Sequence, residues 1–256
     1  MKNPETILIT GASSGIGAAL AARYAATGKT LFLCARNTKR LNAVKKTCEE
    51  KGARVFAEKI DVTDAKSVKN WIKRCHKIAP VDLTVANAGV SVGNGGEIES
   101  EDDARALFAV NINGVVNTVL PSVDLCLKRG AGQIALLSSL AGYRGLPGAA
   151  SYSASKNFVR AWGEALRGSL KKRNVEINVI CPGFVKSGIT AKNKFRMPFL
   201  MEADKAAAVI TKNLAKNKGR ITFPKPLAFA VWLLSCLPAR LAEIVYNFIP
   251  SKNKPE

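Results

Sequence analysis

Tyr152 and Lys156 are spaced so that they could share one face of a helix. A free tyrosine has a pKa of about 10, which is too high for proton transfer near neutral pH. A nearby cation favours the phenolate and lowers that pKa. The pair is therefore a candidate proton donor and acceptor, although a tyrosine and a lysine four residues apart also occur on ordinary exposed helices.

A glycine-rich segment near the start of the chain could hold a dinucleotide. Residues 10–17 read TGASSGIG and stand between an apolar run and a helical pattern. Gly11 permits a tight turn, Gly15 lets a pyrophosphate approach the backbone, and Gly17 lets the helix pack closely on the strand. Three glycines are weak evidence alone, but between a strand and a helix they predict a dinucleotide site.

The end of the second predicted strand bears on the choice of cofactor. Dehydrogenases that use NAD usually carry an acidic residue there, which holds the ribose 2′-hydroxyl. This chain has Arg36 and no acid in the stretch 33–37. A carboxylate would repel a 2′-phosphate, whereas a guanidinium can pair with it. The sequence therefore favours NADP(H) over NAD(H), with a solvated surface arginine as the alternative for Arg36.

These residues need elements that bring them together, and short apolar runs do alternate with helix-length segments. Strands are predicted over residues 6–10, 30–35, 54–60, 83–86, 133–138, 176–180 and 220–223. Helices are predicted over residues 12–27, 38–51, 65–77, 102–128 (with a break near Gly114), 152–172 and 203–216. This pattern predicts an α/β fold, a doubly wound parallel sheet of seven strands with helices on both faces, in one Rossmann-type domain over residues 1–256.

Two later segments have a different character. Residues 187–202 are irregular, include the apolar run Met197–Met201 and follow the sixth strand, so they are predicted to form a substrate lid. Residues 225–250 form an apolar helical tail, with Leu241, Ile244, Val245 and Phe248 at helical spacing after Pro238. The tail is too short to span a membrane. It packs on the protein or on a second subunit, or it contacts a membrane surface with help from basic residues nearby.

Composition bounds the class of protein. The chain has 256 residues, 47% of them hydrophobic, which is enough for a sizeable core. The six cysteines are scattered without metal-ligand spacing, so reduced thiols, no metal site and a cytoplasmic location are predicted. The apolar run 7–9 follows the N-terminus so closely that a secretory leader is not expected.

The formal net charge of +20 raises the question of an anionic partner. Nucleic acid, an anionic membrane at its inner face, and no partner beyond solvent are the three interpretations. Lysines are spread over the whole chain, and no basic run is interleaved with aromatic residues. Nucleic acid is therefore the least favoured, and none is predicted as a partner.

Five motifs together resemble the short-chain dehydrogenase/reductase family. They are TGxxxGIG at the N-terminus, Asn87-Ala88-Gly89 after the fourth strand, Ser139 thirteen residues before the tyrosine, YxxxK, and Pro182-Gly183 after the sixth strand. Each motif is weak by itself, but their order and spacing are specific, and the resemblance covers about residues 5–190.

The resemblance implies catalytic roles for four residues. Ser139 would hold the substrate carbonyl, with Ser138 as the less favoured choice, and Tyr152 would be the acid and base. Lys156 would bind the nicotinamide ribose and lower the tyrosine pKa. Asn111 would sustain a proton relay through water, with Asn113 as the alternative.

The resemblance also implies the residues that bind the cofactor: Gly11, Ser13, Ser14, Gly15, Ile16, Gly17, Arg36, Asp61, Val62, Asn87, Ala88, Gly89, Tyr152, Lys156, Pro182, Gly183 and Val185. Among them the pair 61–62 would fix the adenine, and the turn 87–89 would stabilise the sheet beside the cofactor. One departure concerns a threonine that the family often has near the cofactor amide. Here Lys186-Ser187 stands in that place, and Ser187 could still donate a hydrogen bond.

Together these features predict an NADPH-dependent oxidoreductase that transfers a hydride between nicotinamide and the carbonyl or alcohol carbon of a hydrophobic substrate. The apolar lid and tail favour a lipid-like, fatty-ketone or steroid-like compound. The alternatives are a cofactor-binding sensor or scaffold with little turnover, and a peripheral membrane protein. The resemblance further implies a homodimer or homotetramer, paired through the long helices around Asn111 and Tyr152.

Overall fold

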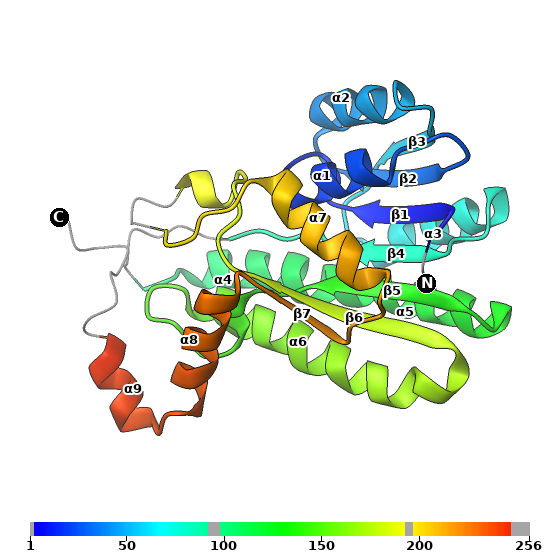
Figure 1. Cartoon of the computed structure of the whole chain (residues 1–256). Helices are drawn as coiled ribbons and strands as arrows, with labels where there is room; N and C mark the ends of the chain where they lie inside the picture. The colour runs from blue at the N-terminus through cyan, green and yellow to red at the C-terminus, as the bar shows by residue number, and fades with distance from the viewer. Residues whose placement is uncertain (1–2, 92–97, 193–196, 247–256) are drawn as a thin grey trace.

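The computed structural model describes residues 3–91, 98–192 and 197–246, and in them seven parallel strands form one sheet (Figure 1). The strands are β1 (Thr6–Thr10), β2 (Thr30–Ala35), β3 (Arg54–Lys59), β4 (Leu83–Ala86), β5 (Gly132–Leu137), β6 (Val175–Pro182) and β7 (Arg220–Phe223). Their order is β3-β2-β1-β4-β5-β6-β7, and the direction of winding reverses between β1 and β4. This confirms the predicted doubly wound sheet.

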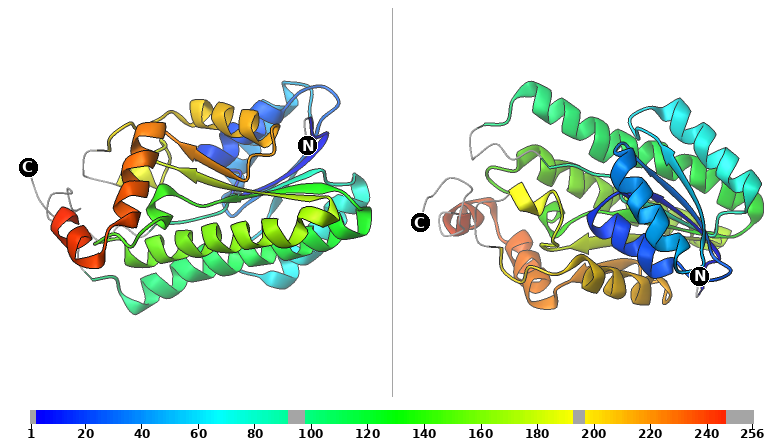
Figure 2. Two further views of the ribbon diagram at one scale, coloured as in Figure 1. Left: turned by 60° about the horizontal axis from the view of Figure 1, so that its bottom comes forward. Right: turned by 90° about the horizontal axis from the view of Figure 1, so that it is seen from above.

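Helices cover both faces of the sheet, which Figure 2 shows edge-on. One face carries α1 (Gly15–Tyr24), α2 (Thr38–Glu49) and α7 (Ala203–Leu214). The other carries α3 (Ala65–Ile78), α4 (Glu101–Phe108), α5 (Gly114–Arg129) and α6 (Ala150–Leu170). A pair of short helices, α8 (Lys225–Cys236) and α9 (Ala239–Tyr246), projects at the end of the molecule where the strands finish (Figure 1).

The core explains why the strands are apolar without interruption. All five residues of β1 are buried, and neighbouring side chains point to opposite faces of the sheet. Ile7 and Ile9 join the cluster under α1, α2 and α7, whereas Leu8 packs with Phe32 and Trp71 under α3. A strand buried on both faces favours apolar residues at successive positions, and the polar exceptions in β1 are the threonines at its two ends, Thr6 and Thr10.

The first helix is shorter than predicted because of its glycines. It begins at Gly15 rather than at residue 12, and it ends at Tyr24. Gly11 and Gly15 adopt positive φ angles of 66° and 54°, and Ser14 is extended, so residues 11–14 form a turn. The Ser14 side chain makes no capping hydrogen bond, which leaves the first N–H groups of α1 available to a ligand.

The predicted break near Gly114 is wrong, since the chain stays helical from Glu101 to Arg129. A π-helical turn, Ala109–Asn113, joins α4 to α5. Gly114 permits close packing instead, because a Cβ there would lie 2.6 Å from Cγ2 of Val62. Among the described residues, this helical run is long and apolar enough to cross a membrane by length and composition. Here it lies against α3 and β5.

The two late segments are only partly described. Within 187–202, Met201 forms a bridge with Val185, its N–H donating to the Phe184 carbonyl at 3.0 Å, while the Phe199 side chain is 57% exposed. The tail is helical as predicted, and Phe248 lies outside the described residues. All six cysteines are free thiols, as expected.

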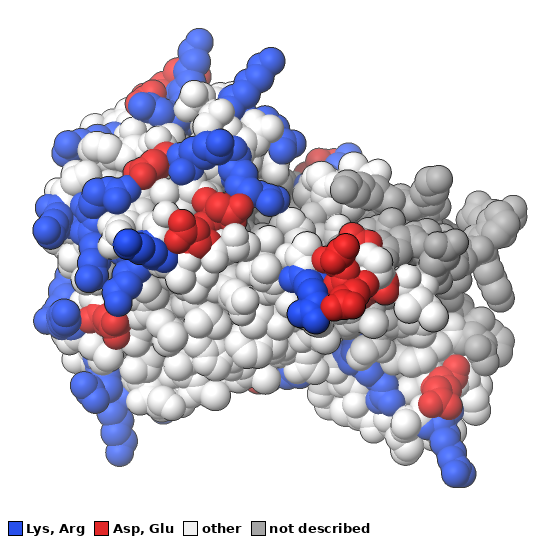
Figure 3. Space-filling model, turned by 180° about the vertical axis from the view of Figure 1, so that it is seen from behind, with Lys and Arg blue, Asp and Glu red and all other residues white. Residues whose placement is uncertain are grey.

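Basic side chains are not distributed evenly. On the face drawn in Figure 3, they gather at the end of the molecule that carries α2 and α3. The basic residues of α2 and α3 are Lys39, Arg40, Lys45, Lys46, Lys66, Lys69, Lys73, Arg74 and Lys77. The helices α8 and α9 hold only Lys225 and Arg240, together with Glu243.

Asp82 provides a test of how the N-terminal strand is held. Its buried carboxylate accepts hydrogen bonds from the N–H groups of Glu5 (2.8 Å) and Thr6 (3.0 Å) and pairs with Arg129 at 2.8 Å. Asp82→Ala leaves buried donors without a partner, so we expect a loss of about 2–4 kcal/mol of unfolding free energy in urea titrations. Arg105→Ala, which breaks an exposed ion pair, should cost less than about 0.5 kcal/mol. Equal midpoints for both variants would contradict this account of Asp82.

Candidate active site

The predicted site residues meet in one cleft of about 710 Å³ beyond the carboxyl ends of the strands. Of the residues expected to bind a cofactor, those that line it are Gly11, Ser13, Ser14, Gly15, Ile16, Arg36, Asp61, Val62, Asn87, Ala88, Gly89, Tyr152, Lys156, Pro182, Gly183 and Val185. Ser139 lines the cleft as well. Gly17 and Asn111 do not line it, and both lie directly behind its wall.

The glycine turn is held against the end of β4 by close packing. A Cβ at Gly11 would lie 2.7 Å from Cα of Ala88, and one at Gly17 would lie 2.5 Å from Nδ2 of Asn87. The same Nδ2 donates to the Thr10 carbonyl at 2.9 Å and to the Gly11 carbonyl at 3.1 Å. Asn87 therefore ties the turn to the sheet beside the cleft.

These residues fit a dinucleotide. The uncapped first turn of α1 presents N–H groups and the positive end of the helix dipole, which suit a pyrophosphate. Gly15 keeps the cleft open, because a Cβ there would lie 3.0 Å from Cβ of Ser187 across it. Asp61, the acidic residue of the described lining, already accepts hydrogen bonds from the Thr63 N–H (3.0 Å) and hydroxyl (2.9 Å).

One end of the cleft is cationic. Arg36 follows β2, and Arg40 lies in the first turn of α2; both are exposed and line the cleft. The sequence analysis did not single out Arg40. The sequence feature that could have indicated Arg40 is the helix cap Asn37. Its side chain accepts a hydrogen bond from the Arg40 N–H at 2.9 Å, which fixes the start of α2 and places Arg40 in the first turn.

The other end brings Ser139, Tyr152 and Lys156 together. Ser139 follows β5, and the other two lie one turn apart on α6. Ser139 and Tyr152 both line the cleft, and the serine hydroxyl lies close enough to influence the titration of the phenol. Burial raises the pKa of Tyr152, and Ser139 acts in the opposite direction. The phenol is therefore protonated at neutral pH.

The expected effect of Lys156 on the pKa of Tyr152 stays a prediction. Its Nζ lies 5.8 Å from the centroid of the Tyr152 ring and donates to the Leu137 carbonyl at 3.0 Å. Burial lowers the pKa of Lys156 to about 8, so the ammonium still predominates at neutral pH. Burial thus shifts both side chains toward their neutral forms.

The two serines have different surroundings. Ser138 is buried and its hydroxyl donates to the Lys156 carbonyl at 2.6 Å, which fastens α6 to the end of β5. The Ser139 hydroxyl accepts from the Ala141 N–H at 3.1 Å and meets Tyr152. The geometry favours Ser139, the residue that the sequence analysis chose.

Asn111 is fully buried in the π-helical turn, whereas Asn113 is exposed. The Asn111 amide donates to the Val90 carbonyl at 2.9 Å and accepts from the Val90 N–H at 2.8 Å. A Cβ on Gly89 would lie 3.3 Å from both Oδ1 of Asn111 and Nζ of Lys156. This places Asn111 close to Lys156, and its part in a proton relay stays a prediction.

The segment after β6 supplies a threonine that the sequence analysis missed. Thr190 and Ser187 both line the cleft. The Ser187 N–H donates to Oγ1 of Thr190 at 2.9 Å, and that hydroxyl donates to the Val185 carbonyl at 3.0 Å. The threonine that the motif lacks directly after Val185 thus stands three residues beyond Ser187, where the turn folds it back to the cleft.

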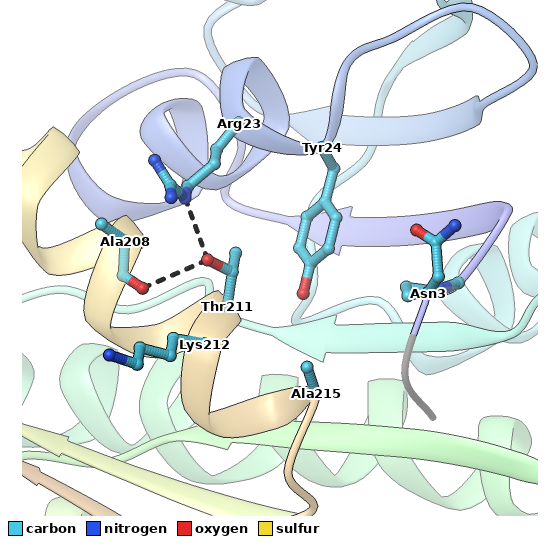
Figure 4. A pocket seen from close by; sticks show the side chains of 8 residues that line it. Asn3, Arg23, Tyr24, Ala208, Thr211, Lys212 and Ala215 are labelled. Carbon is cyan, nitrogen blue, oxygen red and sulfur yellow. Dashed lines mark hydrogen bonds between the residues drawn. The ribbon is translucent and has the colours of Figure 1, made fainter.

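A second pocket, of about 450 Å³, lies between α1 and α7 and contains none of the predicted residues (Figure 4). There Arg23 donates to the Thr211 hydroxyl at 2.9 Å, and that hydroxyl donates to the Ala208 carbonyl at 3.3 Å. Burial raises the pKa of Tyr24, so its phenol stays neutral. The pocket offers no group poised for proton transfer, and the cleft remains the candidate site.

Comparisons with known proteins agree with this geometry. The model of the short chain dehydrogenase family matches residues 5–197. An oxidoreductase of Myxococcus xanthus is 36% identical over 244 residues, covering 95% of this chain and 93% of that protein.

Solved structures share the fold. A short-chain dehydrogenase of Sphingobium yanoikuyae in complex with NADPH is 24% identical, with a TM-score of 0.80 over 98% of both chains. One from Burkholderia phymatum in complex with NAD is 24% identical, with a TM-score of 0.82 over 100% of this chain and 98% of that one. The chain therefore belongs to the short-chain dehydrogenase/reductase family, oxidoreductases that act on carbonyl and alcohol groups with a nicotinamide cofactor.

Proposed function

We propose that the protein is an NADPH-dependent reductase of hydrophobic ketones. The observation that carries the proposal is that Ser139, Tyr152 and Lys156 meet in one cleft whose other end holds Arg36 and Arg40. Two cations suit the 2′-phosphate, and a serine and a tyrosine together suit a carbonyl oxygen.

The side chains divide the chemistry between them. The bound nicotinamide supplies the hydride to the carbonyl carbon. Tyr152 gives its proton to the carbonyl oxygen, and Ser139 donates a hydrogen bond to the same oxygen as negative charge develops there. Lys156 holds the ribose, and Asn111 fixes the backbone at Val90 and Gly89 beside it. A tyrosine whose pKa is raised by burial starts protonated at neutral pH, which supports reduction as the working direction.

Removal of the Tyr152 hydroxyl tests whether this side chain is the proton donor. Tyr152→Phe should lower kcat for reduction of apolar ketones by at least about 100-fold, because the proton donor is lost. The dissociation constant for NADPH should stay within about twofold, since the ring and Lys156 remain. Oxidation of NADPH is followed over ketones of graded chain length.

Tyr24→Phe is the matched control, because Tyr24 is also a buried phenol with a raised pKa, but in the other pocket. It should keep the parent rate. Similar rates for Tyr152→Phe and the parent would refute the mechanism. If the parent binds NADPH yet oxidises none with any ketone, the alternative of a cofactor-binding sensor or scaffold gains instead.

The preference for NADPH is proposed from the cationic end of the cleft. Related folds occur with NADPH and with NAD, so the fold does not decide. Arg36 and Arg40 flank the same corner, and Asp61 lies with its carboxylate engaged by Thr63. A 2′-phosphate would meet two guanidinium groups there, whereas residues 33–37 at the end of β2 include no carboxylate to accept a hydrogen bond from a ribose hydroxyl.

Replacing either arginine should therefore weaken the binding of NADPH and leave the binding of NADH nearly unchanged. Arg36→Ala and Arg40→Ala should each raise the KM for NADPH by roughly 10- to 100-fold, the equivalent of a charge-assisted hydrogen bond of about 1.5–3 kcal/mol. The KM for NADH should change by less than about twofold. Lys39→Ala removes a charge from the same helix without touching the lining and serves as the control. Equal effects on both cofactors would sink the proposed preference.

A hydrophobic substrate and a lid are proposed from the segment 187–202. Its first residues line the cleft, and its last described part returns to the site where Met201 pairs with Val185. Between these anchors Phe199 and Leu200 are exposed. Apolar side chains on a segment anchored near Val185 at both of its ends would cover a lipid-like, fatty-ketone or steroid-like substrate.

The apolar face of α8 and α9 is proposed as a peripheral membrane contact of an otherwise cytoplasmic enzyme. Its exposed large residues are Phe229, Trp232, Leu233, Leu241, Ile244 and Val245. An exposed patch of this kind marks an interaction site. The alternative is that a second copy covers it, and a homodimer or homotetramer paired through α5 and α6 is proposed by resemblance.

Sedimentation with vesicles tests whether a membrane or a second copy of the protein covers this apolar face. Since α8 and α9 carry few charges, we expect the protein to sediment with anionic vesicles at low and high salt alike, and Trp232→Ser with Ile244→Ser to abolish this. Binding that high salt removes would point to the basic end of the molecule instead. Absence of sedimentation, together with a dimer in analytical ultracentrifugation that the double variant dissociates, would favour the second copy.

A further inference from the structure

The loop that separates Ser139 from Tyr152 is held at both of its ends by the core. At its start, the Tyr143 ring lies between two guanidinium groups, 5.0 Å from Arg160 and 5.6 Å from Arg220. At its end, the Leu146 N–H donates to the Ser153 hydroxyl at 3.3 Å. In the middle of the loop, residues 144–145 make hydrogen bonds to the α8 and α9 region instead.

Arg144 reaches out of the loop to the end of α8. Its Nη1 donates to the Leu237 carbonyl at 2.7 Å and to the Leu234 carbonyl at 3.1 Å, with the Ser235 carbonyl at 3.5 Å. The last carbonyls of a helix have no partners within it and carry the negative end of its dipole. The guanidinium thus caps α8 from a loop that lies about ninety residues earlier in the chain.

A second contact joins the same loop to α9. The Tyr246 hydroxyl donates to the Gly145 carbonyl at 2.6 Å. Ala242 is the one fully buried residue of α9, so packing alone holds this helix weakly. Arg144 and Tyr246 therefore fasten consecutive residues of the loop to both helices of the α8–α9 hairpin, which we define as residues 225–246.

The inner face of the hairpin also supports the wall of the cleft. Leu227, Ala228 and Val231 of α8 pack on the cluster of Leu140, Val179 and Cys181. A Cβ on Gly183, which lines the cleft, would lie 2.9 Å from Cδ2 of Leu227. Any movement of α8 therefore reaches both the loop and the end of β6.

From these contacts we propose that Arg144 is a positioning residue: it clamps the loop 143–149 to the α8–α9 hairpin and thereby sets how tightly the site binds the body of its substrate. This rests on the proposed function, since the loop joins the two residues that would hold the carbonyl oxygen. The outer face of the hairpin is the exposed apolar surface described above, so whatever covers that surface acts on substrate binding through Arg144.

Loss of the Arg144 contacts should raise the KM for the substrate. Ser139 and Tyr152 are held by β5 and α6 through contacts that do not involve the hairpin, such as the Ser138 bond to the Lys156 carbonyl. The carbonyls that Arg144 holds lie at the last turn of α8, whereas the contact with Gly183 of the cofactor site is made by Leu227 in the first turn. A loosened loop would weaken contacts that the substrate makes equally in the ground state and in the transition state. Loss of such contacts raises KM and leaves kcat unchanged.

The test combines hydrogen exchange with kinetics in the full-length protein. For Arg144→Ala we expect faster amide exchange in both 143–149 and 230–246, a KM for an apolar ketone raised about tenfold, and kcat and NADPH affinity within about twofold of the parent. Arg144→Lys keeps a cation at the helix end and should recover most of the effect. Tyr246→Phe should act in the same direction but more weakly, and Arg105→Ala, an exposed arginine on α4, should change none of these.

Two results would overturn the proposal. Faster exchange confined to the hairpin, with the loop unchanged, would make Arg144 a helix cap without influence on the site. A fall in kcat or NADPH affinity with KM unaltered would place its effect elsewhere. If the parent reduces no ketone, the proposed function fails, yet the exchange of the loop in Arg144→Ala still decides whether the clamp exists.

Discussion

The catalytic end of this protein depends on how closely α6 lies against the end of β5. A Cβ on Gly142 would lie 2.5 Å from the carbonyl carbon of Lys156, so only glycine permits that approach. The Ser138 hydroxyl then bonds to the Lys156 carbonyl at 2.6 Å and fixes the distance. Once helix and strand are held in this way, Ser139 and Tyr152 meet and Lys156 is enclosed.

That enclosure has an electrostatic consequence. Burial raises the pKa of Tyr152 and lowers that of Lys156 to about 8, because both charged forms lose solvation. Each group is pushed toward its neutral state, and Ser139 only partly opposes this for the phenol. The phenol of Tyr152 is thus protonated at neutral pH, as the proposed donation of a proton to a carbonyl requires.

The molecule also separates its surface properties along the direction of the strands. The carboxyl ends of the strands carry the cleft, the segment 187–202 and the apolar α8–α9 hairpin. The basic side chains seen in Figure 3 gather instead around α2 and α3. The described residues of the hairpin include three charged side chains, those of Lys225, Arg240 and Glu243, and its exposed large side chains are apolar.

Local patterns determined much of this protein from its sequence alone. Uninterrupted apolar strands, helical spacing and glycines that demand positive φ depend on near neighbours, and they predicted the sheet, the dinucleotide turn and the Tyr152–Lys156 pair. Only the tertiary structure decided between Ser138 and Ser139, or between Asn111 and Asn113, because burial depends on which distant element packs there. The tertiary structure was likewise needed to identify Arg40, Thr190 and Arg144. Their partners are brought close by the winding of the chain, which no local spacing records.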